Sequence, residues 1–368
     1  MINSSDSVLI TNLTVSVYTV PTDHPEADGT IEWRSTTMVL VELEAGNKKG
    51  LGYSYAHAAT AQVITGILRD LVIGRDVMQL PGITQSMIRA IRNNGYSGIS
   101  MMAVSAVDNA LWDLKAKILE LPLVSLLGKV KNEMLLYGSG GFTTYGDAQL
   151  ATQFNNWQAQ GIQYLKMKIG THPEDDVRRV RAARKAIGDN AELYVDANGA
   201  YNAKQAIRKA QEFADADVTW FEEPVPSDDL NGLVYIREHM PAQTAVAAGE
   251  YGYTLPYFQS MLQAKAVDVL QGDATRCGGI SGFLKAGYLC EAYQVPYSSH
   301  CAPAIHLHAA LALPSFFIAE YFHDHERIER MFFDGNPIPE NGVLKPDMQR
   351  PGLGLELKKK DAEKYKIH

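Results

Sequence analysis

Residues 164–170 read YLKMKIG, a short apolar segment that carries two lysines and ends in glycine. Similar segments occur before and after it, and each is separated from the next by a longer stretch with helical character. They read MLLYGSG, ELYVDANG, TWFEEPV, AVAAGE, VDVLQGD and VPYSSH. Short strands that alternate with amphipathic helices predict parallel βαβ units.

The ionisable residues at the ends of these segments are regularly spaced. From Lys168, the following ones come after 28, 26, 28, 23 and 27 residues, at Asp196, Glu222, Glu250, Asp273 and His300. One strand, one helix and two loops need a length of this order. We therefore expect a (β/α) barrel, because its strands end at one shared mouth, whereas an open doubly wound sheet would spread these groups along an edge.

Two other regions flank the expected barrel at 131–330. Residues 1–130 read as an α+β domain, in which LTVSVYTV and TTMVLVELEA alternate like antiparallel strands joined by a polar loop at 21–34. A helical repeat follows at 101–118. Residues 331–368 contain many glycines and prolines, so we expect a segment that returns to pack against the first domain.

Composition and charge exclude several classes of function. The 368 residues carry a formal net charge of −8, and the lysine-rich run LKKKDAEKYK is typical of a solvated surface. The negative charge argues against a nucleic acid as partner. We also expect no membrane as partner, since no apolar run reaches the ~18 residues of a membrane span. The N-terminus lacks the basic region of a signal peptide. Three cysteines without CxxC spacing predict neither disulfides nor a zinc site, and they favour the cytoplasm.

Three carboxylates follow consecutive expected strands, at Asp196, Glu222 and Glu250. Taken singly, each is more typical of an ion pair or a helix cap. At a shared mouth they would repel one another unless a cation compensated their charge. Oxygen ligands without cysteine or histidine favour Mg²⁺, with Mn²⁺ as an alternative, over zinc.

Lys166 and Lys168 lie two residues apart on one expected strand, so both should face the barrel interior while Met167 packs outward. Two ammonium groups about 6.5 Å apart repel by about 2.5 kcal/mol at an effective dielectric of about 20, which favours a partly neutral lysine. A nearby cation acts in the same direction, and carboxylates oppose it. A K-x-K pattern is usually a solvated edge strand, but the apolar neighbours favour a functional site.

Asp273 and His300 end adjacent strands, so the carboxylate can accept the imidazole N–H and leave the other nitrogen for proton transfer. Glu320 ends the next apolar run and, if protonated, would donate to a developing oxyanion. Together these groups predict removal of the proton α to a carboxylate. Mg²⁺, Lys166 and Glu320 would stabilise the charge of the resulting enediolate.

As a set, these motifs resemble the enolase superfamily and, within it, the mandelate racemase subgroup. The matching motifs are KMK, DAN, EEP, GE, GDATRCGG, SSH and Glu320, together with AVSAVDNALWDLKAK and PGLGLEL. The resemblance spans nearly the whole chain. It implies an α/β fold, a modified TIM barrel (β/α)7β with an α+β N-terminal capping domain that the C-terminal segment completes. It also implies a homo-oligomer.

The resemblance further implies roles for single residues. Lys168 would be the base on one face of the substrate, and the His300–Asp273 dyad would serve the other. Lys166 would bind the substrate carboxylate and depress the pKa of Lys168, while Asn198 would face a substrate hydroxyl. Mg²⁺ would bind to three acids, Asp196, Glu222 and Glu250.

Other subgroups match less well. The muconate-lactonising type would place a lysine where Asp273 stands and uses an aspartate as its third ligand. The galactonate dehydratase type carries a histidine where this sequence has Asn198. Two loops, PTDHPEADGTIEWRS and GYSYAHAA, occupy the places where the family closes its site. They offer side chains that could bind a polyol or cover an aromatic ring: Asp23, His24, Glu32, Trp33, Arg34, Tyr53, Tyr55 and His57.

The first hypothesis for function is a Mg²⁺-dependent lyase that dehydrates a sugar acid, with His300 protonating the leaving hydroxyl. The alternative is an isomerase that uses the same enediolate, either a racemase or epimerase of a 2-hydroxy acid or a lactone cycloisomerase. A hypothesis from another class is a catalytically silent metal-binding protein. The first two imply a small-molecule carboxylate as substrate.

Overall fold

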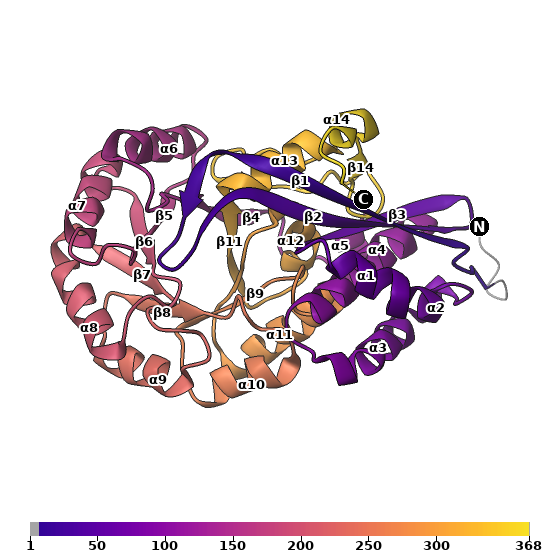
Figure 1. The fold of residues 1–368 in the computed structure, drawn as a ribbon, viewed down its shortest axis with the longest axis horizontal. Coiled ribbons are helices and arrows are strands. Elements are labelled where there is room, and N and C mark those ends of the chain that lie inside the picture. The colour runs from indigo at the N-terminus through magenta and orange to yellow at the C-terminus, as the bar shows by residue number, and fades with distance from the viewer. Residues whose placement is uncertain (1–6, 368) are drawn as a thin grey trace.

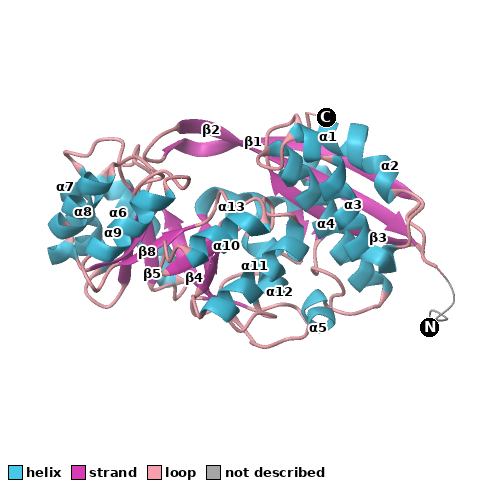
Figure 2. Ribbon diagram, turned by 90° about the horizontal axis from the view of Figure 1, so that it is seen from below, coloured by secondary structure: helices cyan, strands magenta, loops and turns pink. Residues whose placement is uncertain are grey.

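The computed structural model describes residues 7–367, and Figure 1 shows them as a strand barrel with its ring of helices beside an α+β domain. The first six residues of the stretch used to assess a signal peptide lie outside the described residues. A long hairpin of β1 and β2 leaves the α+β domain and crosses over the barrel (Figures 1 and 2).

The N-terminal domain is built on a three-stranded antiparallel sheet in the order β1-β2-β3. Its strands are β1 Asn12–Ala27, β2 Glu32–Ala45 and β3 Lys48–Tyr55. Its helical segments are α1 Thr60–Val63, η1 Ile64–Leu68, α2 Arg69–Val72, η2 Val77–Gln79, α3 Leu80–Ala90, η3 Arg92–Asn94, α4 Ile99–Ile118 and α5 Leu123–Leu127. A Cβ on Gly52 would stand 2.2 Å from the backbone nitrogen of Ala110. Glycine therefore allows β3 to lie directly against α4.

Two predictions for this domain are wrong. Residues 21–34 are mostly strand rather than loop, because β1 and β2 remain paired at Glu26 and Trp33 after an irregularity that starts at Pro21. Residues 52–55, also assigned to a loop, belong to β3. In both places cross-strand hydrogen bonds satisfy the backbone, and this outweighs the low strand propensity of proline, glycine and acidic residues.

The barrel contains eight parallel strands, closed by pairing of the last with the first. In the described part of the chain these are β4 Met134–Gly140, β5 Tyr164–Lys168, β6 Glu192–Asp196, β7 Val218–Glu222, β8 Ala245–Ala248, β9 Val269–Gly272, β10 Tyr297–Ser299 and β11 Phe316–Phe322. Helices connect successive strands: α6 Asp147–Ala159, α7 Asp176–Ile187, α8 Ala203–Glu212 with η4 Ala214–Ala216, α9 Leu230–His239, α10 Leu255–Gln263, α11 Gly279–Tyr293 and α12 Pro303–Ala310. The modified (β/α)7β barrel with a capping domain is confirmed.

Large side chains fill the barrel interior below its mouth. Tyr137, Tyr194 and Trp220 form one buried cluster, in which the rings of Tyr194 and Trp220 stack 4.9 Å apart. Two residues further along their strands, Tyr194 is followed by Asp196 and Trp220 by Glu222. Because side chains two apart share a face, the apolar layer supports a polar layer above it.

The C-terminal segment contacts both domains. It contains α13 His323–Phe332, β12 Phe333–Asp334, β13 Val343–Leu344, β14 Glu356–Leu357 and α14 Lys359–Glu363. β13 pairs with β4, while the Thr19 N–H donates to the Tyr365 carbonyl at 2.9 Å, next to the N-terminal sheet. None of the described helices has both the length and the apolar character that crossing a membrane requires.

Candidate active site

The ends of β6, β7 and β8 bring three carboxylates together. Oxygens of Asp196, Glu222 and Glu250 lie within 4.8 Å of one another, and all three side chains are buried. The parallel register sets Asp196 beside Glu222. Gly249, with φ +140°, precedes the third acid, and a Cβ there would stand 2.2 Å from the Gln271 carbonyl oxygen. The three acids, regularly spaced in the sequence, thus lie close together at the mouth of the barrel.

Both lysines of β5 face this cluster. The fully buried Lys166 has its Nζ 2.8 Å from Glu320 Oε1 and 3.5 Å from Asp196 Oδ2, and it donates to Glu222. Lys168 Nζ donates to Asp196 Oδ2 at 2.5 Å. The side chain of Met167 packs in the outer hydrophobic core, as the alternation predicted.

The lysine pKa values move in the opposite direction to the repulsion argument. Burial lowers the pKa of Lys168 and so does Lys166, but the charges of Asp196, Glu320 and Glu222 together raise it. Burial likewise lowers the pKa of Lys166, and Glu222 and Glu320 raise it well above its usual range. The carboxylates thus oppose the repulsion between the lysines, and a partly neutral lysine stays a prediction that depends on a bound cation. A cation at the carboxylates would act against this effect.

The cluster has more negative than positive charge. Five carboxylates face three cationic side chains: Asp196, Glu222, Glu250, Asp273 and Glu320 against Lys166, Lys168 and Arg276. Burial raises the pKa of Glu222 well above its usual range although Lys166 opposes it. Glu250 Oε2 is buried without a hydrogen-bond partner. An all-oxygen donor set with this charge fits a hard divalent cation.

The dyad expected from the spacing is present in the structure. His300 Nδ1 lies 2.8 Å from Asp273 Oδ2, and Nε2 lies 3.3 Å from Glu250 Oε2. Burial would raise the pKa of Asp273, but the hydrogen bond and charge of His300 lower it. The N–H of Thr275 donates to Asp273 Oδ1 at 2.6 Å, which fixes the carboxylate. One imidazole nitrogen is thus held while the other faces the mouth.

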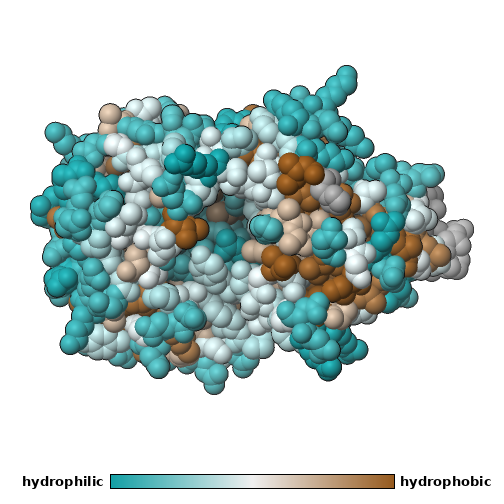
Figure 3. Space-filling model, viewed as in Figure 1, coloured by the Kyte–Doolittle hydropathy of each residue, from teal (hydrophilic) through white to brown (hydrophobic). Residues whose placement is uncertain are grey.

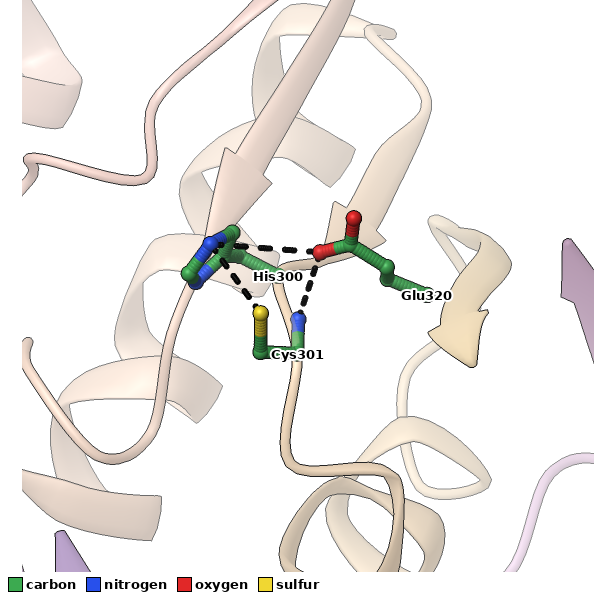
Figure 4. A group of neighbouring side chains, drawn as sticks. All are labelled: His300, Cys301 and Glu320. Atoms are coloured by element: carbon green, nitrogen blue, oxygen red, sulfur yellow. Dashed lines mark hydrogen bonds and ion pairs between the residues drawn. The ribbon is translucent and has the colours of Figure 1, made fainter. Parts of the chain in front are cut away.

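Glu320 is surrounded by groups that favour its charged form. Burial would raise its pKa, but Lys166 and His300 hold the pKa well below the usual range. Its Oε2 accepts the N–H of Cys301 at 2.7 Å and lies 3.9 Å from His300 Nε2 (Figure 4). Cys301 Sγ lies 3.2 Å from the same nitrogen. Glu320 therefore pairs with Lys166 and accepts a backbone hydrogen bond, and its expected role as a donor to an oxyanion stays a prediction.

A cavity of about 560 Å³ lies between this mouth and the N-terminal domain. Figure 3 shows the face hollowed at this place, with hydrophobic residues along one side. Lys168, Asn198 and His300 line it, but Lys166 does not. Asn198 Oδ1 is buried without a hydrogen-bond partner, so its amide is free to meet a ligand. The contact expected between Lys166 and a substrate carboxylate stays a prediction.

Three of the eight side chains proposed from the two loops line the cavity, and these are Trp33, Tyr55 and His57. The other five do not. Arg34 pairs with Glu32 in solvent, and the Tyr53 hydroxyl donates to Glu329 at 2.6 Å. Asp23 and His24 line a different cavity, beside α6. Both β1 and β2 curve over the barrel, and only part of each strand faces the mouth.

The structure also places residues at the cavity that sequence reasoning missed, above all Arg276. Its guanidinium lies 3.2 Å from Glu250 Oε1 and 3.6 Å from Asp273 Oδ2. Tyr251, Cys301 and His325 line the cavity as well. Arg276 stands three residues after Asp273 in GDATRCGG, so position in that motif was the available signal. No comparable signal marks His325.

Two family models match this chain. The model described as mandelate racemase / muconate lactonizing enzyme, N-terminal domain, matches residues 12–128, and the one described as enolase C-terminal domain-like matches residues 149–362. The chain belongs to the mandelate racemase/muconate lactonizing enzyme family of the enolase superfamily. The family resemblance found in the motifs is therefore confirmed.

The chain is similar over most of its length to family members of known structure or named activity. It is 50% identical to a mandelate racemase/muconate lactonizing enzyme-like protein from Rubrobacter xylanophilus, over 98% of this chain and 100% of that one, with a TM-score of 0.96. A racemase from Streptomyces coelicolor A3(2) with bound magnesium is 30% identical, over 98% and 100%, with a TM-score of 0.91. The L-talarate/galactarate dehydratase of Salmonella typhimurium LT2 is 31% identical, over 87% of this chain and 80% of that protein. Further relatives are named as cycloisomerases and as an epimerase.

Proposed function

We propose that this protein is a Mg²⁺-dependent enzyme that removes the α-proton of a carboxylate substrate and dehydrates a monocarboxylic sugar acid. One observation carries the proposal: a cluster of three buried carboxylates contacts Lys168 from β5 and His300 from the end of β10, and both of these side chains line the cavity. Two proton carriers on different strands allow one to act on the α-carbon and the other on the leaving group.

The proposed metal ligands are Asp196, Glu222 and Glu250, with Mg²⁺ as the ion and Mn²⁺ as an alternative. The magnesium-bound family structure supports this assignment. When bound, the ion supplies positive charge beside the substrate carboxylate as the α-proton leaves. A cytoplasmic location and a homo-oligomer remain predictions.

Lys168 is the group placed to take the α-proton, because its amine reaches the cavity. It must first release its own proton, which nearby positive charge favours. The C–H bond breaks toward Lys168, and the electron pair passes into the substrate as an enediolate. His300 Nε2 then gives a proton to the β-hydroxyl as the C–O bond breaks, while Asp273 holds Nδ1–H. The enol that forms becomes a 2-keto-3-deoxy acid.

The cavity favours a substrate with one carboxylate. Among the described residues that line it, the two long cationic side chains are Lys168 and Arg276, and both already pair with carboxylates. Burial holds the pKa of His325 well below its usual range, which disfavours a positive charge there. The remaining lining mixes apolar and polar side chains, among them Trp33, Met102, Phe322, Thr36, Thr37, His57 and Asn198. Among the described lining residues, no lysine or arginine is left unpaired for a second carboxylate, and this supports a substrate with one carboxylate.

An isomerase is the second candidate. The same two proton carriers can remove a proton from one face of the α-carbon and return it on the other. A 30% identical family member is a racemase, which favours this reaction as the alternative.

The test is NMR in D₂O with Mg²⁺ and a panel of aldonates, deoxy-aldonates, aldarates and 2-hydroxy acids. We expect a 2-keto-3-deoxy acid from a monocarboxylic sugar acid and none after chelation, with activity restored by Mg²⁺. Deuterium at C2 with inversion and no loss of water would select the isomerase. Turnover of aldarates alone would overturn the assignment of a monocarboxylic substrate. Turnover that survives chelation would overturn the metal-dependent mechanism.

A further inference from the structure

A second group of ionisable side chains lies outside the active site, between β1 and the start of α13. Asp23 and Glu26 belong to the part of β1 that crosses the barrel, and His323 is the first residue of α13. One carboxylate oxygen of each acid and one imidazole nitrogen lie within 4.8 Å of one another. The three side chains come from segments 300 residues apart in sequence.

These side chains are only partly satisfied by protein partners. His323 Nε2 lies 3.0 Å from Asp23 Oδ2, and this hydrogen bond lowers the pKa of Asp23 to about 2. Glu26 is fully buried: its Oε2 accepts Trp33 Nε1–H at 2.8 Å, and its Oε1 has no hydrogen-bond partner. Asp324 Oδ2, also buried, has no partner.

The local charge is negative. Asp23, Glu26 and Asp324 carry three carboxylates, and Arg327 supplies the one guanidinium that acts on all three. Arg327 pairs with Asp324 and donates to the Pro21 carbonyl at 2.8 Å. Burial, with the charge of Asp324, raises the pKa of Glu26 to about 9. The form of Glu26 that this pKa favours is uncharged, so a divalent ion would bind with release of the Glu26 proton and would give the buried Oε1 the partner that it lacks.

We propose that Asp23, Glu26 and His323 form a second divalent-cation site, suited to Zn²⁺, that fastens the β1–β2 hairpin to α13. One imidazole with two carboxylates is a donor set that zinc accepts, with a remaining position for water. A cavity of about 490 Å³ reaches Asp23 and His323 from outside. The side chain of Asp23 is 40% exposed and that of His323 is 19% exposed, so an ion can enter from solvent.

The site is linked to the active-site cavity through Trp33. This residue is the cross-strand partner of Glu26, donates its indole N–H to that carboxylate and lines the cavity. Its ring also packs edge-on against Phe142, 5.6 Å away. A cation at Glu26 would therefore hold the part of the hairpin that covers the catalytic cavity.

The experiment titrates Zn²⁺ into the chelator-treated full chain at saturating Mg²⁺, with zinc counted by equilibrium dialysis and elemental analysis. We expect one tightly held Zn²⁺ per chain, and a Tm that rises with it. Glu26→Gln and His323→Gln should each weaken binding by about tenfold or more. His24→Gln is the matched control, because His24 lines the same outer cavity but is outside the ligand group.

The variants separate this site from the active site. Zinc binding should persist in Asp196→Asn and in Cys301→Ser, since Cys301 belongs to another potential ligand group with His300 and Glu320. Binding that is lost in either of these variants and kept in His323→Gln would overturn the proposal, and so would the absence of zinc binding in the unchanged chain. If Glu26→Gln does not fold, the partly exposed His323→Gln decides the question alone.

Discussion

At the scale of the residue, Lys166 and Lys168 show how one strand places two identical groups in different surroundings. Lys166 is enclosed by Glu222 and Glu320 and is not exposed, whereas Lys168 contacts Asp196 and reaches the cavity. The two positions lie about 6.5 Å apart along the strand, yet only the one nearer its end opens to a ligand. Proximity to the strand end therefore separates an enclosed, ion-paired lysine from the lysine that we propose as the base.

Replacement of the two proton carriers tests these roles. Lys168→Ala and His300→Asn should each reduce turnover of at least one stereoisomer by about 10²- to 10⁴-fold, because each removes a group that transfers a proton. Binding of Mg²⁺, measured by calorimetry, should persist in both. Lys185→Ala, on the exposed face of α7, is the control and should behave like the unchanged chain. Full activity in both active-site variants would contradict the mechanism.

At the scale of the element, α4 satisfies the start of a helix in the other domain. Asp108 Oδ1 accepts the N–H of Ser281, and Asn109 Oδ1 accepts the N–H of Ile280, both at 2.9 Å. These N–H groups belong to the first turn of α11, where the helix itself offers no carbonyl to accept their hydrogen bonds. The motif AVSAVDN thus joins the capping domain to the barrel through polar side chains on an otherwise apolar helix.

The pH dependence of stability tests this contact. Burial raises the pKa of Asp108 from an ordinary value near 3.8 to about 6. Between about pH 4 and pH 6 the unfolded chain gives up this proton and the folded chain keeps it, so stability should fall as pH rises through this window. The free energy of unfolding should fall by up to about 3 kcal/mol and stay constant above about pH 6. Melting curves of Asp108→Asn should lack this fall, whereas Asp70→Asn, an exposed change of the same charge, should retain it. An equal pH slope in Asp108→Asn and the unchanged chain would show that Asp108 does not titrate in this way.

At the scale of the whole molecule, the tip of the β1–β2 hairpin docks on the barrel. The N–H of Thr143 donates to the Ala27 carbonyl at 2.9 Å, and the Thr171 hydroxyl donates to the Asp28 carbonyl at 2.5 Å. A Cβ on Gly29 would stand 2.2 Å from the Ala197 carbonyl oxygen. The tip therefore contacts the backbone of Ala197, directly after Asp196 at the end of β6. Asp28 and Ile31, also at the tip, line the cavity.

Gly29→Ala should displace the tip, because a backbone carbonyl cannot move aside as a flexible side chain can. We expect kcat/KM to fall by up to about 100-fold, in line with the effect of misplacing a positioning group, while Mg²⁺ binding is retained. Steady-state kinetics give the answer. Gly66→Ala is the control, since a Cβ there meets nothing within 4 Å. Unchanged kinetics in Gly29→Ala would mean that the tip does not shape the site.

The sequence by itself determined the barrel and the strand-end positions of Asp196, Glu222, Glu250 and His300, because regular spacing and alternation are local properties of the chain. Only the tertiary structure decided which charged groups surround Lys168 and Glu320, since these come from other strands. It also decided that residues 21–34 form paired strands, and that Arg276 and His325 reach the cavity. These features follow from backbone pairing and electrostatic contacts between distant segments, which no local pattern records.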